Sequence, residues 1–167
     1  MFLKNDGRTG PRTTTPDGLE RVVSAQLVDA DRETIEIVTA IAGLLAAVAY
    51  ADRHVSPEET QALREALSRI HGLDEPGVHA IETALCADVV RIATVERPRF
   101  TRALVEHADR ALRLEVLAVL VELAAADGVL TLSEVSTLRS LATALGLDQS
   151  DYNLLQERHK DRLSTLK

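Results

Sequence analysis

Apolar residues recur every three or four positions along the chain from Leu19 onward, and no stretch alternates as a β-strand would. This spacing is typical of α-helices that bury one face. Gly, Pro and short polar runs interrupt the pattern and separate the helices that it predicts. We therefore predict an all-α fold, a single-domain bundle of about seven to eight helices. The predicted helices cover residues 19–28, 32–49, 57–70, 78–92, 98–108, 112–125, 135–145 and 152–163.

Two of the predicted helices, 32–49 and 112–125, are apolar on nearly every side. A helix of this kind must be covered by other helices on each of its faces. We expect both to lie at the centre of the bundle.

The chain repeats itself around these two central helices. When Asp52 is placed on Asp127, the segment Ala-Asp-Arg-His-Val-Ser-Pro-Glu-Glu aligns with Ala-Asp-Gly-Val-Leu-Thr-Leu-Ser-Glu. The alignment continues through matched positions in the following helix, its glycine stop and the next helix cap: Leu63 with Leu138, Ile70 with Leu145, Gly72 with Gly146, and Asp74 with Asp148. We expect an internal duplication with halves at about 33–92 and 110–163, packed face to face about a pseudo-twofold axis.

Residues 1–18 differ from the rest because Gly, Pro, Thr and charged residues dominate them. They carry no periodic apolar face, so we expect a flexible N-terminal tail. Residues 19–167 are predicted to form the helical domain. Hydrophobic residues make up 46% of the chain but aromatic residues only 2%, so its core should be aliphatic.

The net charge of −7 argues against a phosphate-binding surface, and scarce aromatics leave few platforms for stacking bases, so no nucleic-acid partner is expected. The longest apolar run, residues 35–50, is shorter than the roughly 20 residues that cross a bilayer, so membrane insertion is not expected either. The sequence starts without a secretory signal, and Cys86 on an apolar stripe is predicted to be a buried thiol. These features favour the cytoplasm.

The repeated turn carries the main candidate chemistry. Each copy places an Asp after an apolar helix and a Glu seven residues later: Asp52 with Glu59, and Asp127 with Glu134. Helix C-termini present unpaired carbonyl oxygens, and carboxylates beside them can hold a hard cation. We predict a divalent metal site, with calcium, magnesium or manganese as the ion.

A plainer interpretation is helix capping. Ser56 with Glu59, and Thr131 with Glu134, have the spacing of reciprocal capping pairs. Capping accounts for the glutamates but not for the aspartates. An EF-hand is excluded, because its twelfth position, a glutamate, would fall on Leu63 or Leu138.

The run Ala-Ala-Asp-Gly-Val-Leu-Thr-Leu-Ser-Glu from Ala125 to Glu134, with Leu-Gly-Leu-Asp downstream, resembles the TerB family. This family includes tellurite-resistance TerB and the TerB-like domain of some membrane-linked J-protein co-chaperones. The resemblance extends from about Ile35 to Leu163. It implies acidic clusters that bind divalent cations, and action in stress-response complexes near the membrane. The first copy departs from the family pattern, because Arg53 and His54 follow Asp52.

We expect a non-enzymatic TerB-like module that binds a divalent cation and acts as a sensor or interaction component with protein partners. The alternative is a metal-free protein–protein interaction scaffold with a co-chaperone-like role. A small enzyme that uses His54 with the carboxylates is the third interpretation. The sequence carries no signal for oligomeric state.

Overall fold

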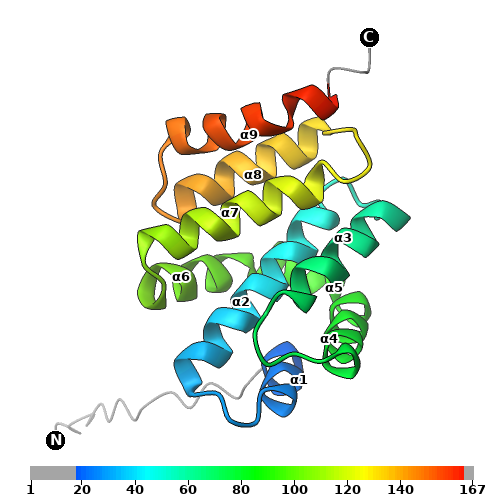
Figure 1. Cartoon of the computed structure of the whole chain (residues 1–167), viewed down its shortest axis with the longest axis vertical. Coiled ribbons are helices and arrows are strands. Elements are labelled where there is room, and N and C mark those ends of the chain that lie inside the picture. Colours follow the sequence, from blue (N-terminus) through cyan, green and yellow to red (C-terminus); the bar gives the residue numbers. More distant parts are fainter. Residues whose placement is uncertain (1–17, 164–167) are drawn as a thin grey trace, which may run out of the picture.

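The computed structural model describes residues 18–163, with side chains as far as residue 160, and this part of the chain is helical without strands (Figure 1). Eight of its helices span nine residues or more, so the predicted all-α bundle is confirmed. The elements are α1 (Gly18–Gln26), α2 (Arg32–Ala49), α3 (Pro57–Ser68), α4 (Glu75–Ala87), α5 (Val89–Arg91), the π-helix η1 (Ile92–Glu96), α6 (Arg97–His107), α7 (Arg110–Ala124), α8 (Leu132–Ala144) and α9 (Gln149–Leu163). The N-terminal tail predicted for residues 1–18 falls outside the described residues, except for Gly18, which begins α1.

The helices of the two repeats pack in matching ways. α2 contacts α3 and α4, and in the second copy α7 contacts α8 and α9. Between the copies, α2 contacts α7, while α3 reaches across to α7 and α8 reaches across to α2. Such reciprocal exchange is the contact pattern of two units related by a twofold axis. In Figure 1, α7, α8 and α9 form the upper part and α2, α3 and α4 lie below them.

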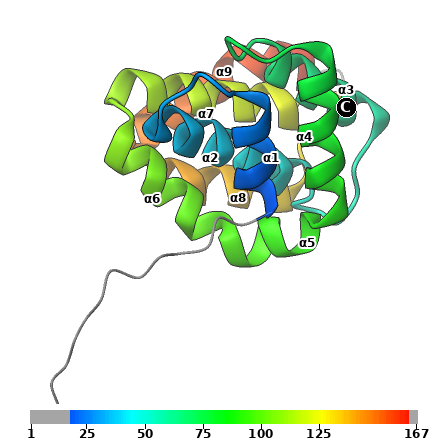
Figure 2. The same cartoon turned by 90° about the horizontal axis from the view of Figure 1, so that it is seen from below.

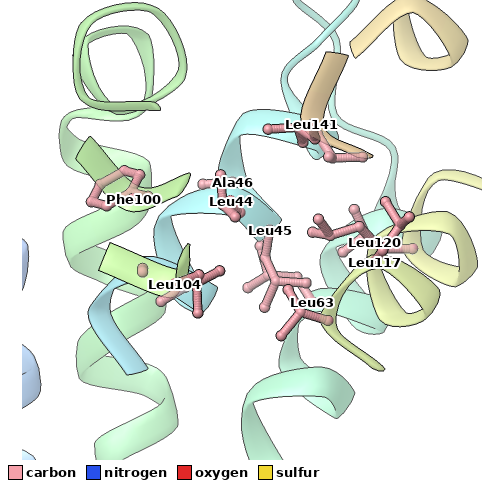
Figure 3. Close-up of a cluster of buried hydrophobic side chains, with 14 of the residues drawn as sticks. Leu44, Leu45, Ala46, Leu63, Phe100, Leu104, Leu117, Leu120 and Leu141 are labelled. Carbon is pink, nitrogen blue, oxygen red and sulfur yellow. The ribbon is translucent and has the colours of Figure 1, made fainter. Parts of the chain in front are cut away.

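The core is centred on α2. Leu44 and Leu45 are fully buried, and Leu117 and Leu120 of α7 meet this helix from the other repeat. Figure 3 shows Phe100 on one side of α2 and the two α7 leucines on the other. The near-continuous apolar composition of residues 38–49 is therefore explained by partners on several faces, as predicted for a central helix.

α6 packs more extensively on α2 than any other helix does. The side-chain contacts run in antiparallel order, because Glu36 meets His107 at one end and Gly43 meets Phe100 further along. Gly43 lets this interface close, since a Cβ there would lie 2.2 Å from a carbon of the Phe100 ring.

Two expectations from the sequence were wrong in detail. The apolar stripe from Val78 to Ile92 predicts one helix, but α4 ends at Ala87, and α5 and η1 follow. Asp88 has an extended φ of −135° that breaks the helix, while Ile92 still reaches the core. Cys86, predicted to be buried, is exposed, because it lies next to the buried Leu85 on the outer side of α4.

Among the described residues, α2 is the longest apolar helix, and neither it nor another helix there has the length and hydropathy of a membrane span.

Candidate metal centre at the paired turns

The two repeated turns have the same backbone path. Four residues after each central helix ends, the turn places a residue in the left-handed region, Arg53 with φ 66° in the first copy and Gly128 with φ 81° in the second. The amide of Arg53 donates to the carbonyl of Tyr50, and the amide of Gly128 donates to that of Ala125, both at 3.0 Å. The match between the copies is therefore structural as well as sequential.

The aspartates stabilise these turns locally. The amide of His54 donates to Asp52 Oδ1 at 2.8 Å, and the amide of Val129 donates to Asp127 Oδ1 at 2.9 Å. Both aspartates are exposed. Each one closes an Asx turn, the short-range structure that Asp commonly forms. This bond supplies a structural reason for the aspartates that capping of the following helix does not give.

The glutamates cap the next helix in both copies. Glu59 Oε2 accepts from the amide of Ser56 at 2.7 Å, and Glu134 Oε2 accepts from the amide of Thr131 at 2.6 Å. The Ser56 and Thr131 hydroxyl oxygens accept in return from the amides of Glu59 and Glu134. The capping boxes are complete, as the alternative interpretation of the sequence predicted.

The two capping glutamates also meet each other. Glu59 and Glu134 are each only 3% exposed, and their carboxyl groups interact across the boundary between the repeats. Burial, assisted by the neighbouring Glu134 carboxyl, raises the pKa of Glu59 to about 7 against the lowering effect of the Ser56 amide. In a twofold arrangement, equivalent residues meet only at the axis. This pair therefore marks the centre of the duplication.

The structure brings two of the four predicted ligands together. Glu59 and Glu134 form the buried pair, while Asp52 and Asp127 lie in the exposed turns on either side. Within residues 18–160, no group of three or more His, Cys, Asp or Glu side chains is placed to hold a metal ion. His54 donates its amide to Asp52, and its side chain is exposed.

The sequence offers the carboxylates of both turns for a shared or paired pocket, but it does not show that the two glutamates alone meet. The aligned turns identify Glu59 and Glu134 as equivalent, but the position of the axis depends on how α3 packs on α7 and α8 on α2. A buried polar residue at the same place in two apolar repeats is the signal that could have found the pair.

Backbone strain distinguishes the two turns and gives a first prediction. A Cβ at Gly128 would meet no atom within 4 Å, so only its left-handed φ opposes a side chain there. We expect Gly128→Ala to lower the free energy of unfolding by about 1 kcal/mol. Arg53→Gly should not destabilise, since it relieves the matching strain. Urea unfolding of both variants measures the difference; equal losses would contradict it.

One family comparison adds to this geometry. The TerB family model, described as tellurite resistance protein TerB, matches residues 38–157. No curated protein and no solved structure gives a significant match. The family match covers most of the chain and includes both repeated turns with the glutamate pair between them. The chain therefore belongs to the TerB family.

Proposed function

We propose that this protein is a non-enzymatic TerB module that binds one divalent cation between Glu59 and Glu134. The observation that carries the proposal is the convergence of these two buried carboxyl groups, one from each repeat. Two carboxylates side by side repel each other when both are ionised, and a cation between them removes that repulsion.

The remaining oxygen atoms suit such an ion. In the capping boxes, the described hydrogen-bond donors all reach Oε2 of the glutamates. Glu59 Oε2 accepts from the Ser56 amide, and Glu134 Oε2 accepts from the amide and the hydroxyl of Thr131. Oε1 of each glutamate is left to a proton or a cation. The capping boxes hold the carboxylates in place before the ion arrives, which lowers the entropic cost of binding.

The donor set favours magnesium or manganese over calcium. Calcium takes 6–8 oxygen ligands, whereas magnesium keeps several waters and is commonly bound through one or two carboxylates. The exposed Asp52 and Asp127 flank the pair and add negative charge near its approach. Their role is to attract the hydrated cation rather than to coordinate it directly.

The number of ions bound tests the arrangement. If the pair on the axis is the site, calorimetric titration of chelator-treated protein with magnesium or manganese gives one ion per chain. Independent turns would give two. Glu59→Gln and Glu134→Gln should each abolish binding while keeping the capping box, because Gln also caps.

Neighbouring residues supply the controls for this experiment. Glu58 is exposed beside Glu59, so Glu58→Gln removes the same charge without touching the pair and should leave binding in place. Asp52→Asn and Asp127→Asn keep an oxygen for the turn amide and should weaken binding only modestly. Absence of binding by the unmodified protein, or binding that survives both glutamine variants, refutes the site.

A groove on the first repeat favours the second candidate function, a metal-free scaffold for protein partners. It has a volume of about 240 Å³ between α2, α3, α4 and α5, and it is mostly apolar, with Val55 and Cys86 exposed at its edge. Its second-copy counterpart is not equivalent, because within the described residues no element follows α9 as α5 follows α4. Retained partner binding by the Glu59→Gln variant would favour this function.

The setting that we propose is the cytoplasm, in a stress-response assembly of the tellurite-resistance type. The family match supports this placement. Cation occupancy would then report on conditions in the cell to a protein partner. Co-purification of partners with and without magnesium tests it, and a partner set insensitive both to the ion and to Glu134→Gln would argue for the scaffold.

A further inference from the structure

A second polar site lies far along α2 from the paired turns. It is a pocket of about 180 Å³ between the N-terminal part of α2, the C-terminal part of α6 and the start of α1. α2 contributes Arg32, Glu36 and Thr39, which lie on one face of the helix at intervals of four and three residues. Opposite them on α6 are Arg99, Phe100, Arg102, Ala103, Glu106 and His107. Figure 2 shows α1, α2 and α6 at this end of the molecule.

The buried polar atom in this pocket is the Thr39 hydroxyl. Thr39 is 3% exposed, and no hydrogen-bond partner within the described residues reaches its Oγ1. A buried hydroxyl without a partner costs roughly 1–3 kcal/mol. Such a cost is commonly retained where the group serves a ligand.

The carboxylates of the pocket are already engaged. Glu36 Oε1 accepts from Arg32 Nε at 2.7 Å, and its Oε2 lies 2.8 Å from His107 Nε2. Those contacts hold the pKa of Glu36 below its usual value, Arg32 contributing most. Glu20 accepts from Arg99. The negative charges of Glu36 and Glu20 are therefore already paired with cationic or donor groups.

Donors remain in excess. A guanidinium carries five N–H donors, and Arg32 uses one of them on Glu36. Arg102 is exposed on α6 and forms no ion pair with the described residues. Together with the Thr39 hydroxyl, these groups surround the pocket with N–H and O–H donors that lack acceptors.

We propose that this pocket binds a small oxyanion, either free phosphate or the carboxylate of a small metabolite, through Arg102, Arg32 and the Thr39 hydroxyl. The two parallel N–H donors of a guanidinium group match the oxygen spacing of both a phosphate and a carboxylate. At about 180 Å³ the pocket is smaller than the roughly 300–1,000 Å³ of sites for drug-sized ligands, which favours an ion or a small acid. Binding would also satisfy the orphan hydroxyl.

Glu106 provides a sharper test, because substitutions at Glu106 and at Arg102 should change anion binding in opposite directions. It lies one helical turn after Arg102 and lines the same pocket. Its negative charge repels an anion in the pocket. Glu106→Gln should therefore strengthen anion binding, while Arg102→Gln should weaken it by at least about tenfold, the loss of one charge-assisted hydrogen bond.

The test is a titration of the full chain with sodium phosphate and, separately, sodium acetate, followed by amide chemical shifts in metal-free, phosphate-free buffer. Sodium chloride at equal ionic strength controls for screening. Saturable changes in the amide chemical shifts of α2 and α6 support the proposal. The anion that binds more tightly, phosphate or acetate, identifies the class of oxyanion. No saturable shift in either arm overturns it.

Variants separate a binding role from a structural one. Thr39→Val should raise the melting temperature of the free protein, because it removes an unpaired buried hydroxyl, and weaken anion binding about tenfold. Arg158→Gln, an exposed arginine on α9, should change neither. Equal loss of binding in Arg102→Gln and Arg158→Gln, or weaker binding in Glu106→Gln, overturns the proposal.

Discussion

Gly43→Ala is expected to lower the free energy of unfolding by about 2–3 kcal/mol, although alanine normally stabilises a helix interior relative to glycine. The reason is the close approach of α2 and α6. The added Cβ would lie 2.2 Å from Phe100 Cε2 and 2.5 Å from two further ring carbons. Phe100 is 2% exposed and packed against α2, so either the ring or the helices must shift. Urea unfolding measures the loss.

A double-mutant cycle isolates this contact. Phe100→Ala alone should cost about 3–5 kcal/mol, since it leaves a cavity against α2. In the double variant, the Gly43→Ala methyl group points into that cavity and should add little further loss. The two effects are therefore expected to be non-additive by more than about 1 kcal/mol. Additive losses would mean that the ring and the helix are not in the tight contact described here.

The central position of α2 and α7 was predictable, because a helix that is apolar on nearly every side must be covered by other helices. α2 begins at Arg32 and ends at Ala49 as the pattern predicts, since an Asp cap precedes it and a polar turn follows. The glycine stops also hold, with φ of 90° at Gly72 and 70° at Gly146. Such features depend on a few neighbouring residues, and the sequence contains them in full.

Features set by long-range packing were not predictable in the same way. The stripe from Val78 to Ile92 carries no proline or glycine to indicate the break at Asp88. The pairing of Glu59 with Glu134 depends on how the two repeats cross. The sequence identifies the candidate carboxylates but not which of them meet.

The glutamate pair makes stability depend on pH in an unusual direction. The pKa of Glu59 is about 7 in the folded protein and 4.5 as the ordinary value, so between these values the folded state binds more protons. Its contribution to stability is complete below about pH 4.5 and is lost as the pH rises through 7. The loss is on the order of 3 kcal/mol, at about 1.4 kcal/mol for each pH unit.

Denaturant unfolding of metal-free protein between pH 5 and pH 8 measures this dependence. The part of the pH dependence of the unfolding free energy that comes from Glu59 should be absent in Glu59→Gln, because glutamine is neutral throughout. It should be retained in Glu58→Gln. Other groups contribute their own pH dependence, so the difference between the two variants is the informative quantity. Identical slopes in both would show that the buried pair does not hold the proton.

A proton and a cation are alternative means of relieving the same repulsion, and this links the pH dependence to the proposed function. Below pH 7 a divalent ion must displace the proton on Glu59, so its apparent affinity should rise with pH and level off above 7. Binding near pH 6 should release close to one proton, measured by calorimetry in buffers with different heats of ionisation. Above pH 8 the release should vanish, and the ion should restore the stability that deprotonation removes. An ion that binds without proton release at pH 6 would be bound elsewhere, with the glutamate pair serving only to join the two repeats.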